Sequence, residues 1–365
     1  MTVWIVDLEP HTQRYTHEWR SHIPKEFGQH FTTRVIQGYA PPTPPQGGAF
    51  LNWQSTCEYK ATQQTEWLHL WRRGEIQPGD YVLFTDAWNP QILQTRYLAD
   101  LEGIPITMGG LWHAGAYDPQ DYLGRCSGNV TTGWWHHTEQ ALFSALDHNF
   151  FATQYHIRLF AQHHHTVAGP YQVTDLLGGA SGKIHRVGWP LDYVWATARE
   201  YACLKAPLIV SPHRLSPEKQ PEIFRDLARS MPQYEWVMAQ DQKLSKSQYH
   251  DLLSRAKIVF SANLQETLGI GQLEGAVFGA VPLSPNRLSY TEMYPATDLY
   301  PSEWTLSYDH YLKHKSQLMA RISQEMSDIR YASARRVARH TQISAYMSST
   351  DLISVIQNTL TKKNS

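Results

Sequence analysis

The stretch Asn263–Glu292 reads NLQETLGIGQLEGAVFGAVPLSPNRLSYTE, and two of its glutamates, Glu266 and Glu274, stand eight residues apart around Leu-Gly-Ile-Gly. It follows the apolar run 256–260, which predicts a buried parallel strand, and it continues into 272–279, whose apolar spacing suits a helix packed on a sheet. A strand, a glycine-bearing turn and a helix start can together hold a diphosphate. The reason is that the backbone N–H groups at a helix N-terminus are unpaired and the helix dipole favours negative charge there.

The two glutamates narrow this interpretation. Carboxylates repel a phosphate, but they accept strong hydrogen bonds from sugar hydroxyls. Glu266 and Glu274 beside a diphosphate site therefore predict binding of a nucleotide sugar. The alternative is a pair of carboxylates that only stabilise the dipole at the start of a helix.

The length and composition of the chain limit the classes of protein that this prediction can describe. The chain has 365 residues, 42% of them hydrophobic and 12% aromatic, which is enough for two globular domains with separate cores. The formal net charge of −1 argues against a uniformly basic nucleic-acid binder, although it leaves room for a local basic patch.

The amino-terminal residues 1–7 lack the basic leader and apolar run of a signal peptide, and no stretch approaches the ~20 apolar residues of a membrane span. Cys57, Cys126 and Cys203 show neither metal-ligand spacing nor a disulfide framework. These features predict a cytoplasmic protein without a metal centre. The run His163–His165 is predicted to be a solvated loop, because consecutive residues cannot converge on one ion from a regular element.

Strand and helix patterns alternate along the chain in two series. The first series has expected strands at 3–6, 33–36, 80–84, 104–108 and 149–153, and expected helices at 17–27 (interrupted at Pro24), 62–73, 92–102 and 139–148, with an exposed loop at 41–48. The second has expected strands at 207–211, 234–239, 257–261 and 281–283, and expected helices at 220–230, 247–255 and 271–278. Such alternation predicts two doubly wound parallel sheets.

Two domains follow from this order. The first is expected at 1–190 and the second at 191–339, with a carboxyl-terminal helix at about 340–365 packing back on the first domain. The clusters 71–73 and 335–340 are basic; they are predicted to be solvated helix faces, with contacts to nucleic-acid phosphates as the alternative.

The first strand of the second domain leads into a turn that carries Arg214 and Lys219. This turn lies at the carboxyl edge of the expected sheet, where open α/β folds bind ligands. Both cations can reach diphosphate oxygens, Arg as a planar fork and Lys as a point charge. Taken alone they would be ordinary surface cations, so the prediction depends on the nearby glutamates.

At this point the chain resembles the family-4 glycosyltransferases, which have the GT-B fold. Residues 214–219 resemble the Arg-Leu-x-x-Glu-Lys turn of that family, and 266–274 match its Glu-x7-Glu motif. The small-residue turn 279–282 and the interdomain turn 186–192 also resemble family segments. The resemblance is strong over 183–293; in the first domain it extends only to the order of elements.

The resemblance implies a GT-B architecture, with two Rossmann-like domains facing across a cleft that closes about a hinge near 188–192. It also implies transfer of a sugar from a nucleoside diphosphate sugar, UDP-sugar favoured, to a hydroxyl, with retention at the anomeric carbon and without a metal or cofactor. The implied roles are diphosphate binding by Arg214 and Lys219, backbone N–H donation by Gly269, Ile270 and Gly271, ribose binding by Glu274, and contact with the transferred sugar by Glu266.

In the first domain, His113 is the candidate catalytic residue. It follows the expected strand 104–108, where the family commonly carries a histidine facing the donor sugar, and a structural histidine is the alternative. Trp112 and Asp118 share its loop and are candidates for the acceptor site or the binding cleft. Asp86 and Trp88, which follow another expected strand, are further candidates for the binding cleft.

The loop 7–15 departs from the family, because it has no glycine where a Gly-Gly turn is usual. Its Glu9, Arg14 and Tyr15 predict an unusual acceptor site. The pattern resembles phage-encoded members, some of which modify hydroxymethylated bases in DNA, so a 5-hydroxymethylpyrimidine in phage DNA is the leading acceptor. The alternatives are a glycan or lipid-linked acceptor and a catalytically silent nucleotide-sugar binding protein. A dinucleotide-dependent oxidoreductase ranks last, because the loop lacks the Gly-x-Gly-x-x-Gly signature.

Overall fold

The computed structural model describes residues 1–12, 14–41, 43, 52–128, 133–164, 182–201, 203–328 and 332–362. The chain divides into two compact units, Met1–Pro190 with Ser348–Ser365 as unit 1 and Leu191–Met347 as unit 2. Most of the expected loop 41–48, together with His165, lies outside the described residues.

Unit 1 is built around a parallel sheet of strands in the order β2-β1-β3-β4-β5-β6. Its strands are β1 (Thr2–Val6), β2 (Thr32–Ile36), β3 (Tyr81–Phe84), β4 (Thr107–Trp112), β5 (His148–Phe151) and β6 (Ile184–Arg186). Its helices are α1 (Tyr15–Gly28), α2 (Trp53–Arg72), α3 (Gln91–Glu102), α4 (Tyr122–Cys126), α5 (Trp134–Ala145), α6 (Gln154–His163) and α15 (Thr350–Lys362).

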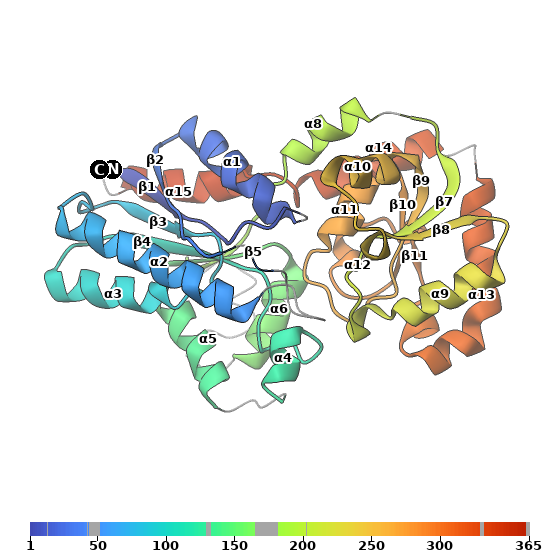
Figure 1. Ribbon diagram of the computed structural model, residues 1–365, viewed down its shortest axis with the longest axis horizontal. Helices are drawn as coiled ribbons and strands as arrows, with labels where there is room; N and C mark the ends of the chain where they lie inside the picture. The colour runs from blue at the N-terminus through green and yellow to red at the C-terminus, as the bar shows by residue number, and fades with distance from the viewer. Residues whose placement is uncertain are drawn as a thin grey trace. The chain divides into compact units, whose positions relative to one another are not determined.

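Helices cover both faces of the sheet in unit 1. In Figure 1, α1 (blue) and α15 (red) lie along one side of the sheet, and α2 and α3 lie along the other. The core is rich in aromatic side chains, with Trp4, Trp67 and Trp112 almost completely buried. This burial accounts for part of the high aromatic content of the sequence.

Unit 2 has a second parallel sheet with the strand order β11-β10-β9-β7-β8. Its strands are β7 (Ala206–Ser211), β8 (Glu235–Met238), β9 (Ala256–Phe260), β10 (Val281–Pro285) and β11 (Leu299–Tyr300). Its α-helices are α8 (Tyr193–Glu200), α9 (Pro221–Ser230), α10 (Lys246–Arg255), α11 (Ile270–Val277), α12 (Tyr290–Met293), α13 (Tyr308–Ser327) and α14 (Ala332–Ser344). Short 3-10 turns are η1 (Pro217–Lys219), η2 (Ala239–Asp241), η3 (Ala296–Asp298) and η4 (Ser302–Thr305).

In unit 2 the central strands are apolar and buried on both faces, as expected for a parallel sheet between two helical layers. Figure 1 shows α10, α11 and α14 on one side of this sheet and α9 and α13 on the other. The predicted class, two doubly wound parallel α/β domains, is confirmed.

The predicted position of β4 was wrong. The strand spans Thr107–Trp112, so Gly109 and Gly110 lie inside it and not in a following turn. A Cβ on Gly109 would lie 2.3 Å from the hydroxyl of Tyr81, and one on Gly110 would lie 2.7 Å from a methyl group of Leu146. These glycines therefore allow close packing across the sheet.

Two helices also differ from the prediction. Helix α1 runs unbroken through Pro24, because Trp19, Ile23 and Phe27 form one buried face whose packing outweighs the lost hydrogen bond. Helix α2 begins at Trp53, nine residues before the predicted start at 62, where the side chain of Asn52 accepts a hydrogen bond from the N–H of Ser55.

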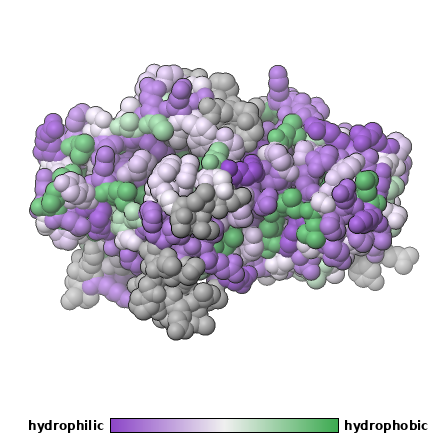
Figure 2. Space-filling model, turned by 90° about the horizontal axis from the view of Figure 1, so that it is seen from below, coloured by the Kyte–Doolittle hydropathy of each residue, from purple (hydrophilic) through white to green (hydrophobic). Residues whose placement is uncertain are grey.

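The visible surface of the protein is largely polar. On the face shown in Figure 2, the coloured hydrophobic residues occur in small groups between hydrophilic ones. Among the described residues, no helix combines the length and the apolar composition that crossing a bilayer requires.

Candidate active site

The candidate donor site lies in unit 2, where two turns meet. Strands β7 and β9 are paired neighbours, so the turns after their carboxyl ends lie at the same edge of the sheet. The N–H of Leu264 donates to the carbonyl of Glu218 over 2.8 Å and joins the two turns directly. The predicted motifs around Lys219 and Glu266 therefore come together in space.

The centre of this site is an ion pair between Lys219 and Glu266. Lys219 is only 9% exposed, and its ammonium lies 3.2 Å from Oε2 of Glu266 and donates to the carbonyl of Gln265 over 2.5 Å. Burial raises the pKa of the Glu266 carboxyl, but the positive charges of Lys219 and Arg214 outweigh burial and hold that pKa below its ordinary value. Glu266 is therefore a carboxylate, fit to accept hydrogen bonds from hydroxyls.

Three residues that the sequence did not single out support Glu266. The amide of Asn263 donates to Glu266 over 3.3 Å and to the hydroxyl of Tyr290 over 3.0 Å. The same amide nitrogen lies 3.3 Å from Nδ1 of His213. Asn263 and Tyr290 lie within the stretch 263–292 and His213 precedes Arg214, so proximity to the motifs was the only signal available from the sequence.

Helix α11 begins beside this pair. Its N-cap is Gly269, at φ 79°, a residue without a side chain, so the first turn keeps its N–H groups available for a bound anion. A Cβ on Gly271 would lie 2.9 Å from Pro212, and one on Gly275 would lie 2.4 Å from Val259 of β9. Both glycines therefore let the helix approach the sheet and the β7 turn closely.

Glu274 is held from a different helix. Its Oε2 accepts a hydrogen bond from the hydroxyl of Tyr249 over 3.1 Å, and its Oε1 lies 3.5 Å from the ammonium of Lys246. Both partners lie on α10, and neither belongs to a motif that pointed to it in the sequence. The carboxylate is 4% exposed, so these contacts fix its direction.

Arg214 is held within its own turn. Its guanidinium donates through Nη2 to Oε1 of Glu218 over 2.7 Å, and Ser216 donates to the same oxygen over 2.5 Å. Burial raises the pKa of Glu218, but Arg214 and Ser216 outweigh it and lower that pKa to about 2. The turn is thus a folded unit that presents Arg214 and Lys219 from fixed backbone positions.

Unit 1 contains a separate pocket of about 500 Å³. Of the predicted first-domain residues, those that line it are Arg14, Tyr15, Asp86, Trp88 and His113. The structure therefore brings five candidates from three separate loops to one cavity.

His113 is engaged through both ring nitrogens. Nε2 lies 2.6 Å from the carbonyl oxygen of Thr85, which can only accept, so Nε2 carries the proton and Nδ1 accepts from the hydroxyl of Tyr15 over 2.8 Å. Burial lowers the pKa of this imidazole. The ring also contacts Trp189 edge-on, with centroids 4.2 Å apart. The His113 imidazole is therefore neutral and held in a fixed orientation in the wall of the pocket.

A further polar part of the pocket wall comes from a lysine that was not predicted. Lys60 on α2 donates to Asp86 over 2.6 Å and to the carbonyl of Trp88 over 2.5 Å. Burial raises the pKa of Asp86, but the charge of Lys60 outweighs it and the pKa is lowered. The pair is internally balanced in charge.

Three candidates do not line this pocket. Trp112 is fully buried in the core, where its indole donates to Asn149 over 2.9 Å, and this corrects its predicted place in a binding cleft. Glu9 accepts hydrogen bonds from Ser55 and Thr56 at the start of α2.

Asp118 accepts from the N–H of Gln120 over 3.0 Å and is 4% exposed. Like Glu9, it has an internal, structural partner, and the prediction that it faces an open cleft is corrected in the same way.

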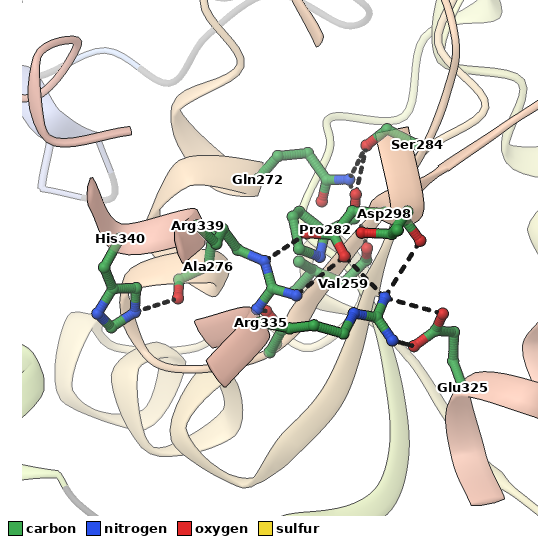
Figure 3. A network of polar contacts seen from close by, with 12 residues as sticks. Val259, Gln272, Ala276, Pro282, Ser284, Asp298, Glu325, Arg335, Arg339 and His340 are labelled. Carbon is green, nitrogen blue, oxygen red and sulfur yellow. Dashed lines mark hydrogen bonds and ion pairs between the residues drawn. The ribbon is translucent and has the colours of Figure 1, made fainter. Parts of the chain in front are cut away.

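The basic cluster 335–340 is also corrected, because two of its arginines point inward (Figure 3). Arg339 makes two hydrogen bonds to Asp298, at 2.6 Å and 3.1 Å, and one to the carbonyl of Ala280. Arg335 pairs with Asp298 at 2.8 Å and with Glu325 at 3.1 Å. This network joins α13 and α14 to the sheet, so these side chains do not form a solvated face.

Within the described ranges, no group of three or more His, Cys, Asp or Glu side chains has the arrangement needed to hold a metal ion. No protein-family model matches the chain. One curated relative, the tRNA-queuosine alpha-mannosyltransferase of Drosophila melanogaster, is 39% identical over 57 residues, which is 16% of this chain and 15% of that protein.

Solved structures match over nearly the whole chain. The sucrose-phosphate synthase of Thermosynechococcus elongatus has a TM-score of 0.60 at 9% identity, covering 100% of this chain and 98% of that one. An alpha-glucosyltransferase in complex with UDP and a 13-mer DNA has a TM-score of 0.56 at 10% identity, covering 99% and 100%. These likenesses establish the fold: the chain has the GT-B architecture.

Proposed function

We propose that this protein is a glycosyltransferase that moves a sugar from a nucleoside diphosphate sugar to a hydroxyl acceptor. The observation that carries the proposal is the pair of carboxylates, Glu266 and Glu274, flanking the open N-terminus of α11, with the Lys219 ammonium 3.2 Å from Glu266. A site for an anion and two carboxylates that can accept hydrogen bonds from hydroxyl groups therefore lie at the same edge of the unit 2 sheet.

The proposed reaction depends on how the site stabilises the negative charge that develops as the sugar is transferred. Negative charge builds on the departing diphosphate as the glycosidic bond breaks, and Lys219, Arg214 and the N-terminus of α11 would stabilise it without a metal ion. Glu274 would accept hydrogen bonds from the ribose hydroxyls, and Glu266 from hydroxyls of the transferred sugar. Retention at the anomeric carbon is part of the proposal through the resemblance to family-4 enzymes, as is the choice of a UDP-sugar as donor.

For the acceptor, we favour a 5-hydroxymethylpyrimidine in phage DNA. Support comes from the structural likeness to an alpha-glucosyltransferase that was solved with UDP and DNA. A second candidate, a modified nucleoside in tRNA, is favoured by the short match to a tRNA-queuosine alpha-mannosyltransferase. Both candidates place the accepting hydroxyl on a nucleoside.

Mass spectrometry of the acceptor tests this proposal. UDP- and GDP-sugars would be offered with duplex DNA containing 5-hydroxymethylcytosine and, separately, with tRNA containing queuosine. We expect a hexose- or pentose-sized mass gain on one nucleoside, unchanged by EDTA and lost in Glu266→Ala but not in Glu222→Ala, which alters an exposed glutamate on α9.

The other outcomes separate the alternatives. Donor hydrolysis without a mass gain on either nucleic acid would keep the transferase and reject these acceptors, leaving a glycan or lipid-linked sugar. Donor binding without any turnover would favour the silent binding protein. Absence of both binding and turnover of every nucleotide sugar would refute the proposal.

A further inference from the structure

The turn after β9, residues 261–265, leads directly to Glu266 and is fixed by contacts with other segments of unit 2. Its first three residues are buried, and their backbone carbonyls accept hydrogen bonds from the side chains of Tyr300, Gln220 and Arg287. The N–H of its fourth residue and the carbonyl of its fifth are bonded to the turn after β7. Each residue of this turn is therefore fixed from outside, so its partners decide where the turn lies.

Arg287, which follows β10, makes two of these contacts. Its Nε and Nη2 donate to the carbonyls of Asn263 and Ala262, over 2.8 Å and 2.9 Å. The guanidinium also reaches η4, where Nη1 donates to the carbonyl of Ser302 over 2.8 Å and Nη2 to that of Thr305 over 3.0 Å. One planar group of five donors therefore joins the turn after β9 to η4, which a lysine ammonium cannot do from a single point.

The backbone beside these contacts adopts an uncommon conformation at two positions. Gln220 has φ 50° and Leu288, which follows Arg287, has φ 59°, both in the left-handed region that residues other than glycine rarely adopt. The amide of Gln220 donates to the carbonyls of Ala262 and Thr305, over 2.6 Å and 2.7 Å. Such conformations persist only where the surrounding structure holds them, and they are concentrated at functional sites. The strain at these two residues therefore favours a role for this turn beyond connecting β9 to α11.

The turn carries groups that contact both members of the central ion pair. The amide of Asn263 donates to Oε2 of Glu266 over 3.3 Å, and the carbonyl of Gln265 accepts from Lys219 over 2.5 Å. We propose that Arg287, assisted by Gln220, is a positioning residue of the candidate donor site. Without itself touching the donor, its guanidinium fixes the backbone from which Asn263 orients the Glu266 carboxylate. This inference rests on the proposed function and adds a residue that acts on the same site through the turn.

Hydrogen exchange on the full chain, resolved along the sequence, tests whether Arg287 fixes the turn. In Arg287→Lys, which keeps the charge but loses the planar fork, exchange at 261–265 should accelerate about 10-fold, as expected when hydrogen bonds from a charged group are weakened. Arg339→Lys is the matched control, because Arg339 is another arginine of unit 2 that donates to a backbone carbonyl, that of Ala280. It should leave exchange at 261–265 unchanged. If Arg287→Lys does not fold, Gln220→Gly takes its place with the same expectation, because it removes a donor to the turn without adding backbone strain.

Donor turnover tests whether this position matters for the reaction. Hydrolysis of UDP- and GDP-sugars and binding of UDP would be measured on the same variants, at a temperature at which all of them are folded. We expect Arg287→Lys to lower kcat about 10- to 100-fold, the effect of a small displacement of a group that orients the substrate. UDP binding should stay close to wild type, because Glu274 is held by α10 and Arg214 by its own turn. A purely structural role would reduce the folded fraction and would not separate kcat from UDP binding.

Three results would overturn the inference: unchanged exchange at 261–265 in Arg287→Lys, accelerated exchange with an undiminished kcat, or equal losses of kcat in Arg287→Lys and Arg339→Lys. A wild-type protein that turns over a donor while Arg287→Lys behaves in the same way refutes only the role of Arg287. A wild-type protein that turns over no nucleotide sugar refutes the transferase, and the exchange at 261–265 then still decides whether Arg287 fixes the turn.

Discussion

At the scale of single residues, the turn of the candidate donor site that carries Arg214 and Lys219 is held by charged side chains of unit 2. Oε1 of Glu218 accepts hydrogen bonds from Arg214 and Ser216, and its backbone carbonyl accepts one from the N–H of Leu264. This one residue therefore connects the turn after β7 to the turn after β9. Hydrogen bonds to charged groups of this kind contribute about 1.5–3 kcal/mol each. Glu218 is therefore a structural carboxylate between the two motifs that were predicted to bind donor.

The stability of this arrangement should depend on pH. The folded-state pKa of Glu218 is about 2, below its ordinary value of 4.5, so its contribution is full above pH 4.5 and is lost as pH falls towards about 2. Relative to wild type, Glu218→Gln should lower the urea midpoint clearly at pH 7. The difference should shrink when both proteins are unfolded at pH 3.5. A difference that is independent of pH would show that the carboxylate charge is not what stabilises the turn.

At the scale of elements, the position of α11 depends on Gly275. The Cβ of an alanine would lie 2.4 Å from a methyl group of Val259, so Gly275→Ala must push the helix away from β9. We expect a loss of about 1–3 kcal/mol in the free energy of unfolding, together with weaker UDP binding. Denaturant titration and calorimetry measure the two effects.

Gly28→Ala is the matched control for Gly275, because a Cβ at Gly28 meets its nearest atom, on Thr33, at an ordinary 3.6 Å. It should leave both quantities nearly unchanged. If Gly275→Ala behaved like this control, the close packing of α11 on the sheet would not be needed for the candidate donor site.

Helix α14 is fixed by the buried pair of Arg339 and Asp298 seen in Figure 3. Arg339→Met should reduce the free energy of unfolding by about 3–5 kcal/mol, because it leaves the Asp298 carboxylate buried without this partner. Arg336→Ala, on the exposed side of the same helix, should change it by less than about 0.5 kcal/mol. Adding Asp298→Asn to Arg339→Met should recover part of the loss; failure to do so would argue against an unpaired charge as the cause.

The elements that the sequence predicted best are the central strands of unit 2. β7 and β9 are short apolar runs bounded by polar turns, and their predicted ends lie within one residue of those observed. The start of α2 was not predictable in this way, because residues 53–61 mix aromatic and polar side chains without a clear period. β4 was misplaced because glycines usually mark turns, and only the packing of Tyr81 and Leu146 shows why they belong in this strand.

The same limit applies to the candidate sites. Glu266 and Lys219 were predicted because each lies in a motif, and the structure places them together. Lys60 and Tyr249 lie in no recognisable sequence motif; their positions depend on contacts with residues that lie far away along the chain.

At the scale of the whole molecule, unit 1 is completed by the carboxyl-terminal helix α15. Leu352, Ile353, Ile356 and Leu360 are its buried side chains, and Thr359 lies 3.4 Å from a ring nitrogen of His148 on β5. Ile356→Ala should lower the free energy of unfolding of unit 1 by about 2–5 kcal/mol, as expected for a fully buried isoleucine. Leu204→Ala, at a position that is 93% exposed, is the control and should have little effect.

Hydrogen exchange resolved along the chain would locate the Ile356→Ala effect. Exchange should accelerate in β1–β6 and remain unchanged in β7–β11, because α15 belongs to unit 1. Equal acceleration in both sheets would show that the two units unfold as one.

The path of the chain through the two units also sets an order for their folding during synthesis. Unit 2 is inserted between Pro190 and Ser348 of unit 1, so its residues have all left the ribosome while unit 1 still lacks its last helix. Unit 2 can therefore close its core first, whereas the sheet of unit 1 waits, with the apolar surface for α15 uncovered, until Thr350–Lys362 emerge. The amino-terminal half of this protein, although made first, is the half that is finished last.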